Sequence, residues 1–199
     1  MRRRLVVSLG FGSLASPVFA HHGAHQAANR ELDGWAVGSF TLTDHEGLAF
    51  TQERLRGRWT FVVFGDTSTC AQPCAAALEA LAGLCRRIER ADAMKTTQAL
   101  FVSLDPQRDS PTRLREYLAC FDTRFIGATA APAVVQRLAD DMGAGGGSAA
   151  SPGADGSRPR YRGSLLLVGP DATIRAEYLA PLDVPQLTSA YLRARRGVH

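Results

Sequence analysis

The sequence has no apolar run long enough to cross a membrane as a single helix. Its longest uncharged stretch near the start, residues 5–20, has 16 residues. A bilayer needs about 20, and two glycines and a proline interrupt this stretch. Three arginines precede it, and Val18-Phe19-Ala20 has the small residues typical of a cleavage site. We therefore expect residues 1–20 to be a secretory signal peptide, with an uncleaved membrane anchor as the alternative.

A large excess of charge of one sign is also missing. The 199 residues have a net charge of +4, and three of the positive charges are Arg2, Arg3 and Arg4 in the expected signal peptide. The remainder therefore carries only +1, which does not indicate a nucleic-acid-binding surface. With 45% apolar and 21% charged residues, the composition is that of one globular domain with a core.

Histidine is scarce, and most of it lies near the start of the chain. The five histidines are His21, His22, His25, His45 and His199. The first three lie within five residues and could bind copper or zinc together with a free α-amino group. The alternative is a solvated terminus, and in both cases we expect residues 21–31 to form a flexible tail. His45 falls in the turn of a predicted β-hairpin over residues 40–51.

Two of the four cysteines, Cys70 and Cys74, lie between a predicted strand and a predicted helix. The strand is Thr60–Phe64, which is rich in β-branched and aromatic residues. Pro73 suits the first position of the helix, where a missing N–H costs nothing. Cys74 is then in the first turn and Cys70 in the loop before it. Unpaired N–H groups and the helix dipole there lower the pKa of a thiol and favour a nucleophile or metal ligand.

The other two cysteines, Cys85 and Cys120, lie on amphipathic helical patterns. We expect both to be buried free thiols that behave as small hydrophobic residues. A structural disulfide between them is the alternative, since export to an oxidising compartment allows disulfides to form. A purely structural bond between Cys70 and Cys74 is disfavoured, because closing so short a loop removes little chain entropy.

Strands and helices alternate along the rest of the sequence. The predicted strands are 60–64, 99–104, 164–168 and 173–179, and the predicted helices are 73–91, 112–121, 133–142 and 184–195. Residues 143–159 are too rich in glycine and serine for packed structure, so we expect a flexible loop. This order predicts an α/β domain over residues 32–199, a thioredoxin-like sandwich. Its central mixed sheet is flanked by helices and has an N-terminal β-hairpin.

Several short segments together carry a family resemblance. They are Gly38–Gly47, Leu55–Trp59, Phe64-Gly65, Cys70-x-x-x-Cys74, Ser103–Pro111 and Phe121–Gly127. In these segments the chain resembles the Sco/SenC/PrrC family, named for the synthesis of cytochrome oxidase. The resemblance extends from about Leu32 to Arg195. Its most specific part is the combination of the spaced cysteines with the aspartate-proline segment.

The resemblance implies a thioredoxin fold that holds copper through Cys70, Cys74 and one histidine. It also implies a role for that copper at the dinuclear copper site of cytochrome oxidase. The place of the family histidine falls at or near Tyr161, and no histidine lies there in this sequence. The cysteine segment departs from the family as well. One extra residue precedes Cys70, and the proline that usually follows the first cysteine has moved to Pro73.

Two functions follow from these observations. The first is a periplasmic copper metallochaperone for the copper-site subunit of cytochrome oxidase. Without the loop histidine, two soft thiolates favour Cu(I) over Cu(II). The second is a thiol–disulfide oxidoreductase, an enzyme that acts on client thiols without copper. Membrane association is expected only if the N-terminal segment stays uncleaved.

Three further residues near the predicted site have both a functional and a structural interpretation. Asp105 either orders the loop beside the cysteines or forms a plain turn after the strand, and we favour the turn. Arg160 and Arg162 would stabilise the thiolates by charge if their loop folds over them. Otherwise they are solvated loop residues.

Overall fold

A single mixed sheet organises the protein. The computed structural model describes residues 29–31, 34–68, 73–89, 93–143 and 164–197. The strands are β1 (Asn29–Glu31), β2 (Thr41–Asp44), β3 (Ala49–Thr51), β4 (Trp59–Gly65), β5 (Thr97–Ser103), β6 (Ile126–Thr129), β7 (Leu165–Val168) and β8 (Ile174–Tyr178). The helices are α1 (Pro73–Glu89), α2 (Pro111–Ala119), α3 (Pro132–Asp141) and α4 (Val184–Arg196), and two 3-10 turns are η1 (Gln52–Leu55) and η2 (Ala93–Thr96). The strand order is β1-β8-β7-β4-β5-β6-β2-β3.

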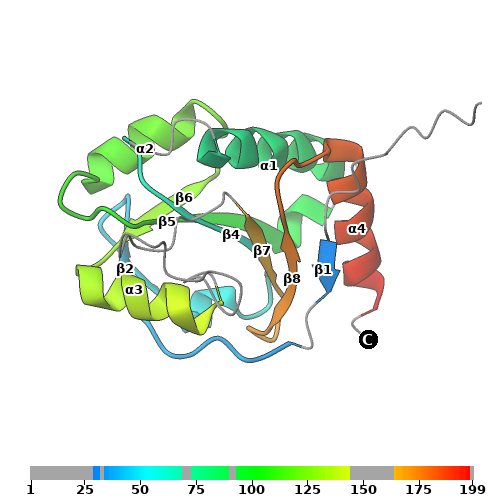
Figure 1. Cartoon of the computed structure of the whole chain (residues 1–199), viewed down its shortest axis with the longest axis horizontal. Coiled ribbons are helices and arrows are strands. Elements are labelled where there is room, and N and C mark those ends of the chain that lie inside the picture. Colours follow the sequence, from blue (N-terminus) through cyan, green and yellow to red (C-terminus); the bar gives the residue numbers. More distant parts are fainter. Residues whose placement is uncertain (1–28, 32–33, 69–72, 90–92, 144–163, 198–199) are drawn as a thin grey trace, which may run out of the picture.

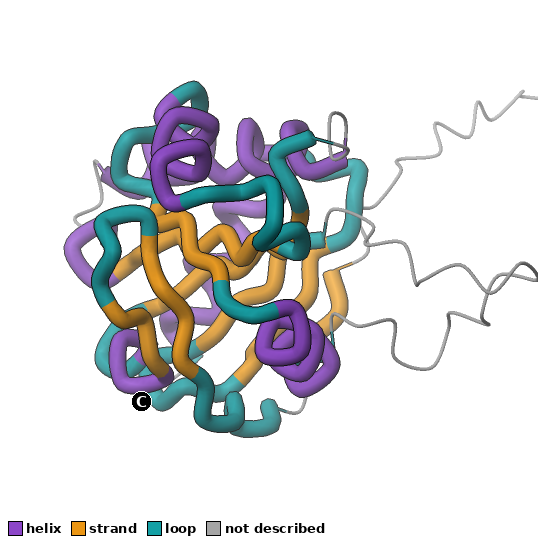
Figure 2. Tube along the Cα trace, turned by 90° about the vertical axis from the view of Figure 1, so that its left-hand side faces the viewer, coloured by secondary structure: helices purple, strands orange, loops and turns teal. Residues whose placement is uncertain are grey.

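The three parallel strands β4, β5 and β6 form the centre of this sheet. All seven residues of β4 and all seven of β5 are buried, as expected for strands that are covered on both faces. Helices α1, α2 and α4 lie on one face, and α3 lies on the other (Figure 1). Figure 2 shows the helices on both sides of the twisted sheet. The predicted α/β class, the thioredoxin-like mixed sheet and the β2–β3 hairpin are confirmed.

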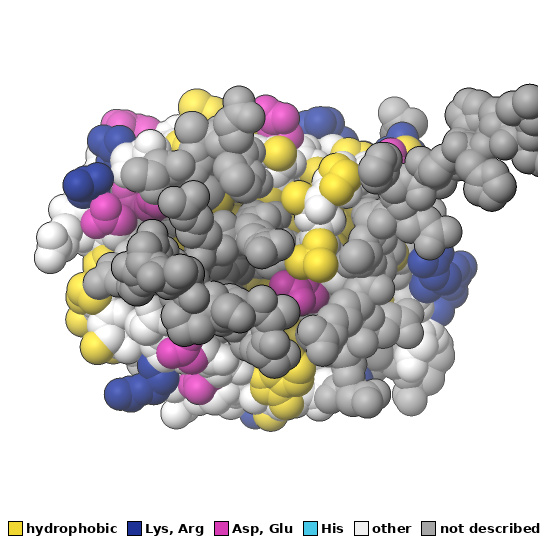
Figure 3. All heavy atoms as spheres, viewed as in Figure 1, with side chains coloured by type: hydrophobic (Ala, Val, Ile, Leu, Met, Phe, Trp, Pro, Cys, Tyr) yellow, Lys and Arg dark blue, Asp and Glu magenta, His cyan; other side chains and the backbone are white. Residues whose placement is uncertain are grey.

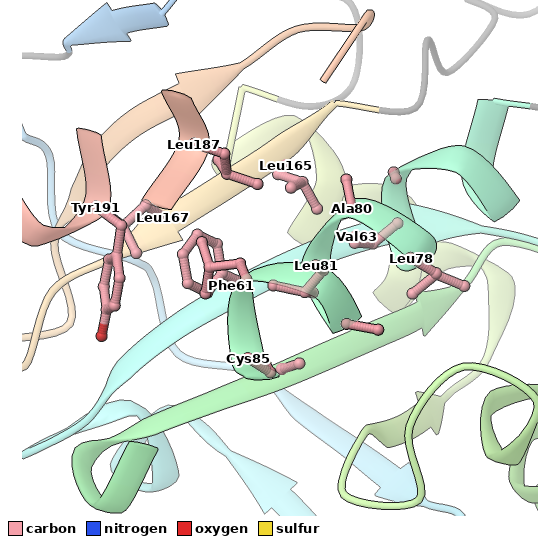
Figure 4. Close-up of a cluster of buried hydrophobic side chains, with 14 of the residues drawn as sticks. Phe61, Val63, Leu78, Ala80, Leu81, Cys85, Leu165, Leu167, Leu187 and Tyr191 are labelled. Atoms are coloured by element: carbon pink, nitrogen blue, oxygen red, sulfur yellow. The ribbon is translucent and has the colours of Figure 1, made fainter. Parts of the chain in front are cut away.

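Alternation along β4 divides the core into two layers. Phe61 and Val63 point to the side of α1, α2 and α4, whereas Val62 and Phe64 point to the side of α3 and the hairpin. This follows from the pleat, which sends successive side chains to opposite faces. Figure 4 shows the first layer, in which Leu81 of α1 lies close to Phe61. Packing in the first layer fixes the position of α1, and therefore also that of its first turn, which contains Cys74.

The predicted elements are found within about two residues of their expected ends, and two strands were not predicted. Residues 29–31 were expected to belong to a flexible tail, but they pair with β8 as β1. β6 pairs with β5 and β2, and it is short and contains a glycine. The predicted signal peptide, the three N-terminal histidines and residues 144–163 lie outside the described residues. No helix among the described residues is long and apolar enough to span a membrane.

The turn of the hairpin is organised by the buried carboxylate of Asp44. It accepts hydrogen bonds from the backbone N–H groups of Glu46 (3.0 Å) and Leu48 (2.9 Å) and from Nη1 of Arg54 (2.7 Å). Burial acts to raise the pKa of Asp44, but these three bonds together hold it below its usual value. The ionised carboxylate is therefore part of the folded state.

We predict that Asp44→Asn lowers the free energy of unfolding by about 2 kcal/mol at pH 7, because three donors lose a charged acceptor. Since the pKa of Asp44 is lowered by folding, its contribution is present above the unfolded pKa near 3.9 and is lost as pH falls through the folded pKa. Urea unfolding at pH 7 and at pH 3 measures both effects. The exposed Glu46→Gln is the control. Equal stability of Asp44→Asn and wild type at pH 7 would contradict the prediction.

Candidate functional site

Cys74 lies where the central strand passes into its helix. It is the second residue of α1, and its side chain is fully buried. Its Sγ lies 3.8 Å from the carbonyl oxygen of Phe64, at the end of β4. Cys74 is disulfide-bonded, so in this state Sγ has no proton to donate to that carbonyl. The predicted partner Cys70 lies outside the described residues.

Gly65, the last residue of β4, gives the sulfur room. A Cβ atom added to Gly65 would lie 2.6 Å from Sγ of Cys74 and 3.2 Å from Cε2 of Phe101. Both distances are shorter than ordinary van der Waals contacts. Any side chain at Gly65 would therefore push the sulfur away from the strand. A glycine inside a strand is a known sign of such a close approach.

The loop between β4 and α1 is held by the carboxylate of Asp109, which is fully buried. Oδ2 accepts hydrogen bonds from the backbone N–H of Thr67 (3.1 Å) and from the hydroxyl of Ser103 (2.7 Å), and Oδ1 accepts one from the hydroxyl of Thr67 (2.6 Å). Nε of Arg113 lies 3.8 Å from Oδ1 and donates to the hydroxyl of Thr67. Asp109 thus joins the loop, the end of β5 and the first turn of α2.

The start of α2 explains why Asp109 is free for this role. Ser110 is the N-cap and accepts a hydrogen bond from the backbone N–H of Arg113, and Pro111 opens the helix. Only one of two adjacent candidates can cap the helix, so the neighbouring Asp109 turns into the core. From the sequence alone, Asp105 was the aspartate with a possible role beside the cysteines. Asp105 forms a turn, because its carbonyl accepts from Arg108 and Asp109, which agrees with the favoured interpretation.

The remaining cysteines occupy opposite environments. Cys85 is buried in the core and free, as predicted, and burial raises the pKa of its thiol to about 12. Cys120 is free but exposed, so its expected burial was wrong, and the alternative disulfide between the two is also excluded. Cys120 follows buried Leu118 by two residues. At about 100° per residue, this turns it away from the buried face of α2.

The described residues supply no imidazole ligand next to Cys74. His45 lies in the hairpin turn, as predicted, and its Nδ1 accepts a hydrogen bond from the backbone N–H of Gly127 (2.8 Å). No three His, Cys, Asp or Glu side chains in the described part of the chain lie close enough to hold a metal ion. Tyr161, Arg160 and Arg162 lie outside the described residues. The geometry therefore provides one sulfur at a helix start and a braced loop that leads to the second cysteine.

We predict that Asp109→Asn lowers the free energy of unfolding by about 2–4 kcal/mol. It leaves buried donors and Arg113 without their charged acceptor. The matched control is Asp105→Asn, because Asp105 is partly exposed and makes one loose ion pair with Arg108 at 3.5 Å. Such a pair contributes at most about 1 kcal/mol. Denaturant unfolding of both variants makes the comparison, and equal losses would contradict the role of Asp109.

We also predict that a thiol reagent labels Cys120 rapidly in the reduced, folded protein and leaves Cys85 unlabelled. Exposure favours the first thiol, whereas a pKa of about 12 and complete enclosure protect the second. Mass spectrometry after a timed pulse counts the labels, with Cys120→Ser and Cys85→Ser as paired controls. Only Cys120→Ser should lose a fast label. Loss of a fast label in Cys85→Ser would show that the core opens on the time scale of labelling.

Comparisons with known proteins agree over most of the chain. The family model described as SCO1/SenC matches residues 29–192. A Stutzerimonas stutzeri protein named "Putative copper-binding protein" is 32% identical over 152 residues, which are 76% of this chain and 73% of that protein. The mitochondrial protein SCO2 of Saccharomyces cerevisiae is 40% identical over 103 residues, 51% of this chain but only 34% of the yeast protein.

A solved structure has the same fold. The crystal structure of Arabidopsis thaliana ScoI with copper bound superposes with a TM-score of 0.68 at 24% identity, and the match covers 82% of this chain and 99% of that chain. The family model spans nearly all of the sheet and helices described above, including the site around Cys74. This chain is therefore a member of the SCO1/SenC family.

Proposed function

We propose that this protein is an exported Sco-type copper carrier. In this proposal a dithiol of Cys70 and Cys74 binds Cu(I) for assembly of the copper site of cytochrome c oxidase. The observation that supports it most is the position of Cys74, a buried sulfur in the first turn of α1 and in contact with the end of β4. Family membership and the copper named for the Stutzerimonas and Arabidopsis relatives support the choice of metal.

The donor set fits Cu(I). Thiolates are soft ligands that suit Cu(I), whereas Cu(II) prefers tetragonal sites with nitrogen or oxygen donors. A Cu(I) ion with two thiolates carries a net charge of −1. The first turn of α1 offers partial positive charge from its unpaired N–H groups, and Arg160 or Arg162 would offset the rest if their loop closes over the site.

The redox state of the cysteines controls copper loading in this proposal. A disulfide has no thiolate to offer, so the bond of Cys74 must be reduced before copper binds. Reduction takes up two electrons and two protons and returns both thiols. Copper is then a cargo that leaves by ligand exchange, in which the ligands of the client replace Cys70 and Cys74 without oxidation of the ion. The client in this proposal is the copper-site subunit of the oxidase.

The alternative function is a thiol–disulfide oxidoreductase that needs no copper. It is favoured by the lack of a histidine at Tyr161 and by the engagement of His45 with Gly127. In this reaction one thiolate attacks a client disulfide and forms a mixed disulfide, which the second thiolate resolves. The client gains two electrons and two protons, and Cys70 and Cys74 end as a disulfide.

We expect the reduced protein to bind one Cu(I) and to bind Cu(II) only weakly at the dithiol. The test removes residues 21–25, so that the N-terminal histidines cannot bind copper, and loads the variant with each ion without oxygen. The matched comparison adds Tyr161→His to the same variant. We expect the added imidazole to strengthen Cu(II) binding more than Cu(I) binding and to produce a thiolate-to-copper absorption band.

Each outcome of this titration separates the two functions. Binding of Cu(I) that is lost in Cys70→Ser and Cys74→Ser supports the copper carrier. No Cu(I) binding together with rapid reduction of a model disulfide supports the oxidoreductase. A strong thiolate-to-copper band with Cu(II) before Tyr161→His would show that another residue already supplies the third ligand, which contradicts the proposed donor set.

A further inference from the structure

A pocket of about 550 Å³ lies at the opposite edge of the sheet from Cys74. Because β4, β5 and β6 are parallel, their first residues share this edge, and Gly65 and Ser103 share the other. At about 3.3 Å per residue, the seven residues of β4 separate the two edges by about 20 Å. A ligand in this pocket would leave the cysteine loop accessible. The volume of the pocket is in the range of small-molecule sites.

Arginine dominates the lining of this pocket. Four arginines, Arg54, Arg56, Arg58 and Arg124, face a single acidic residue, Glu53. On the face shown in Figure 3, by contrast, the lysine and arginine side chains of the described residues lie in separate groups near the edge of the molecule. The pocket is distinguished by the convergence of η1, the turn after it and the turn before β6 on one hollow. A guanidinium group in such a hollow attracts anions where no carboxylate of the chain already neutralises it.

Two of the arginines form fixed walls. Arg54 pairs with Asp44 at 2.7 Å, and its guanidinium lies 4.5 Å from the ring centroid of Phe50. Arg124 pairs with Asp122 at 2.6 Å and with Glu89 at 3.1 Å. Carboxylates of the chain itself therefore already occupy these two side chains.

The other two arginines lie on an anchored turn, and the charge of one of them, Arg56, acts on the exposed carboxylate of Glu53. Arg56 and Arg58 flank Gly57, which has a φ of +73° and donates its N–H to the carbonyl of Pro170 at 2.8 Å. Both side chains are exposed, and neither forms an ion pair with a carboxylate of the described residues. Each guanidinium thus presents five N–H donors from an anchored turn.

We propose that this pocket binds a phosphate-bearing ligand through Arg56 and Arg58. The planar guanidinium matches phosphate with two parallel hydrogen bonds, and a phosphate has enough oxygens to engage both side chains. Arg54 and Arg124, whose charges are already paired with carboxylates, form the sides of the pocket. Met94 and Ile126, which also line the pocket, offer apolar contact to the rest of the ligand. The phosphate belongs either to a soluble compound or to a lipid headgroup.

The test measures binding of the full chain to two probes. Calorimetry with inorganic pyrophosphate tests a soluble phosphate. Flotation with vesicles of phosphatidylglycerol in phosphatidylcholine tests a headgroup, with pure phosphatidylcholine as the blank. The variant Arg56→Ala/Arg58→Ala is compared with Arg137→Ala/Arg193→Ala, which removes two exposed arginines that do not line the pocket. Wild type and all variants keep the uncharged residues 5–20, which could themselves bind to vesicles. Only the difference in binding between variants therefore reports on the pocket.

We expect Arg56→Ala/Arg58→Ala to bind at least one probe about tenfold more weakly or worse, and the control to bind like wild type. Arg56→Lys/Arg58→Lys keeps the charge but loses the paired hydrogen bonds, so it should bind with intermediate affinity. If Arg56→Ala/Arg58→Ala binds only pyrophosphate more weakly, the ligand is a soluble phosphate compound. If it binds only the vesicles more weakly, the ligand is a lipid headgroup.

Three results would overturn the proposal. The first is equal weakening in the pocket variant and the control, which would mean binding by overall charge. The second is no binding of either probe by wild type. The third is binding of a hexaglutamate peptide at Arg56 and Arg58 without binding of either phosphate probe, which would make the pocket a site for acidic protein segments. Unchanged thermal unfolding of the alanine and lysine variants shows that they are folded.

Discussion

The candidate site depends on the hydrogen bonds that the buried carboxylate of Asp109 accepts. It binds the backbone and hydroxyl of Thr67 in the loop before α1, and it binds Ser103 at the end of β5. A buried charge is tolerated only when such donors surround it, so the three groups are obliged to stay together. The loop that continues to the cysteines therefore leaves the sheet from a fixed point. The close contact between Gly65 and Sγ of Cys74 sets the other end of the loop.

The three cysteines that the structure describes lie in three different environments, and these environments determine how each thiol reacts. Cys85 lies in the layer between α1 and β4, where burial raises its pKa to about 12 and makes it inert. Cys120 lies at the exposed C-terminal end of α2, so reagents reach it directly from solvent. Cys74 is also buried, but it lies at a helix start beside a strand end. Its position at the start of the helix, rather than burial alone, is the reason why we propose it as a copper ligand.

Local patterns in the sequence predicted most of the fold, and interactions between distant residues account for what was missed. The apolar run of β4 and the proline at the start of α1 were predicted correctly because each signal lies within a few residues. β1 and β6 are short, and they exist only because strands far away in the chain pair with them. Asp109 was missed as a brace because its partner Thr67 is 42 residues away. The only local sign was its position beside a second possible N-cap.

The central claim is that two thiolates and no imidazole hold copper as Cu(I). X-ray absorption at the copper edge of the Cu(I)-loaded, reduced protein without residues 21–25 tests this claim most directly, since it reports both the oxidation state and the type of ligand atom. The account predicts the edge of Cu(I), two sulfur neighbours and no multiple scattering from imidazole. Imidazole scattering, or a copper ion with fewer than two sulfur neighbours, would contradict it.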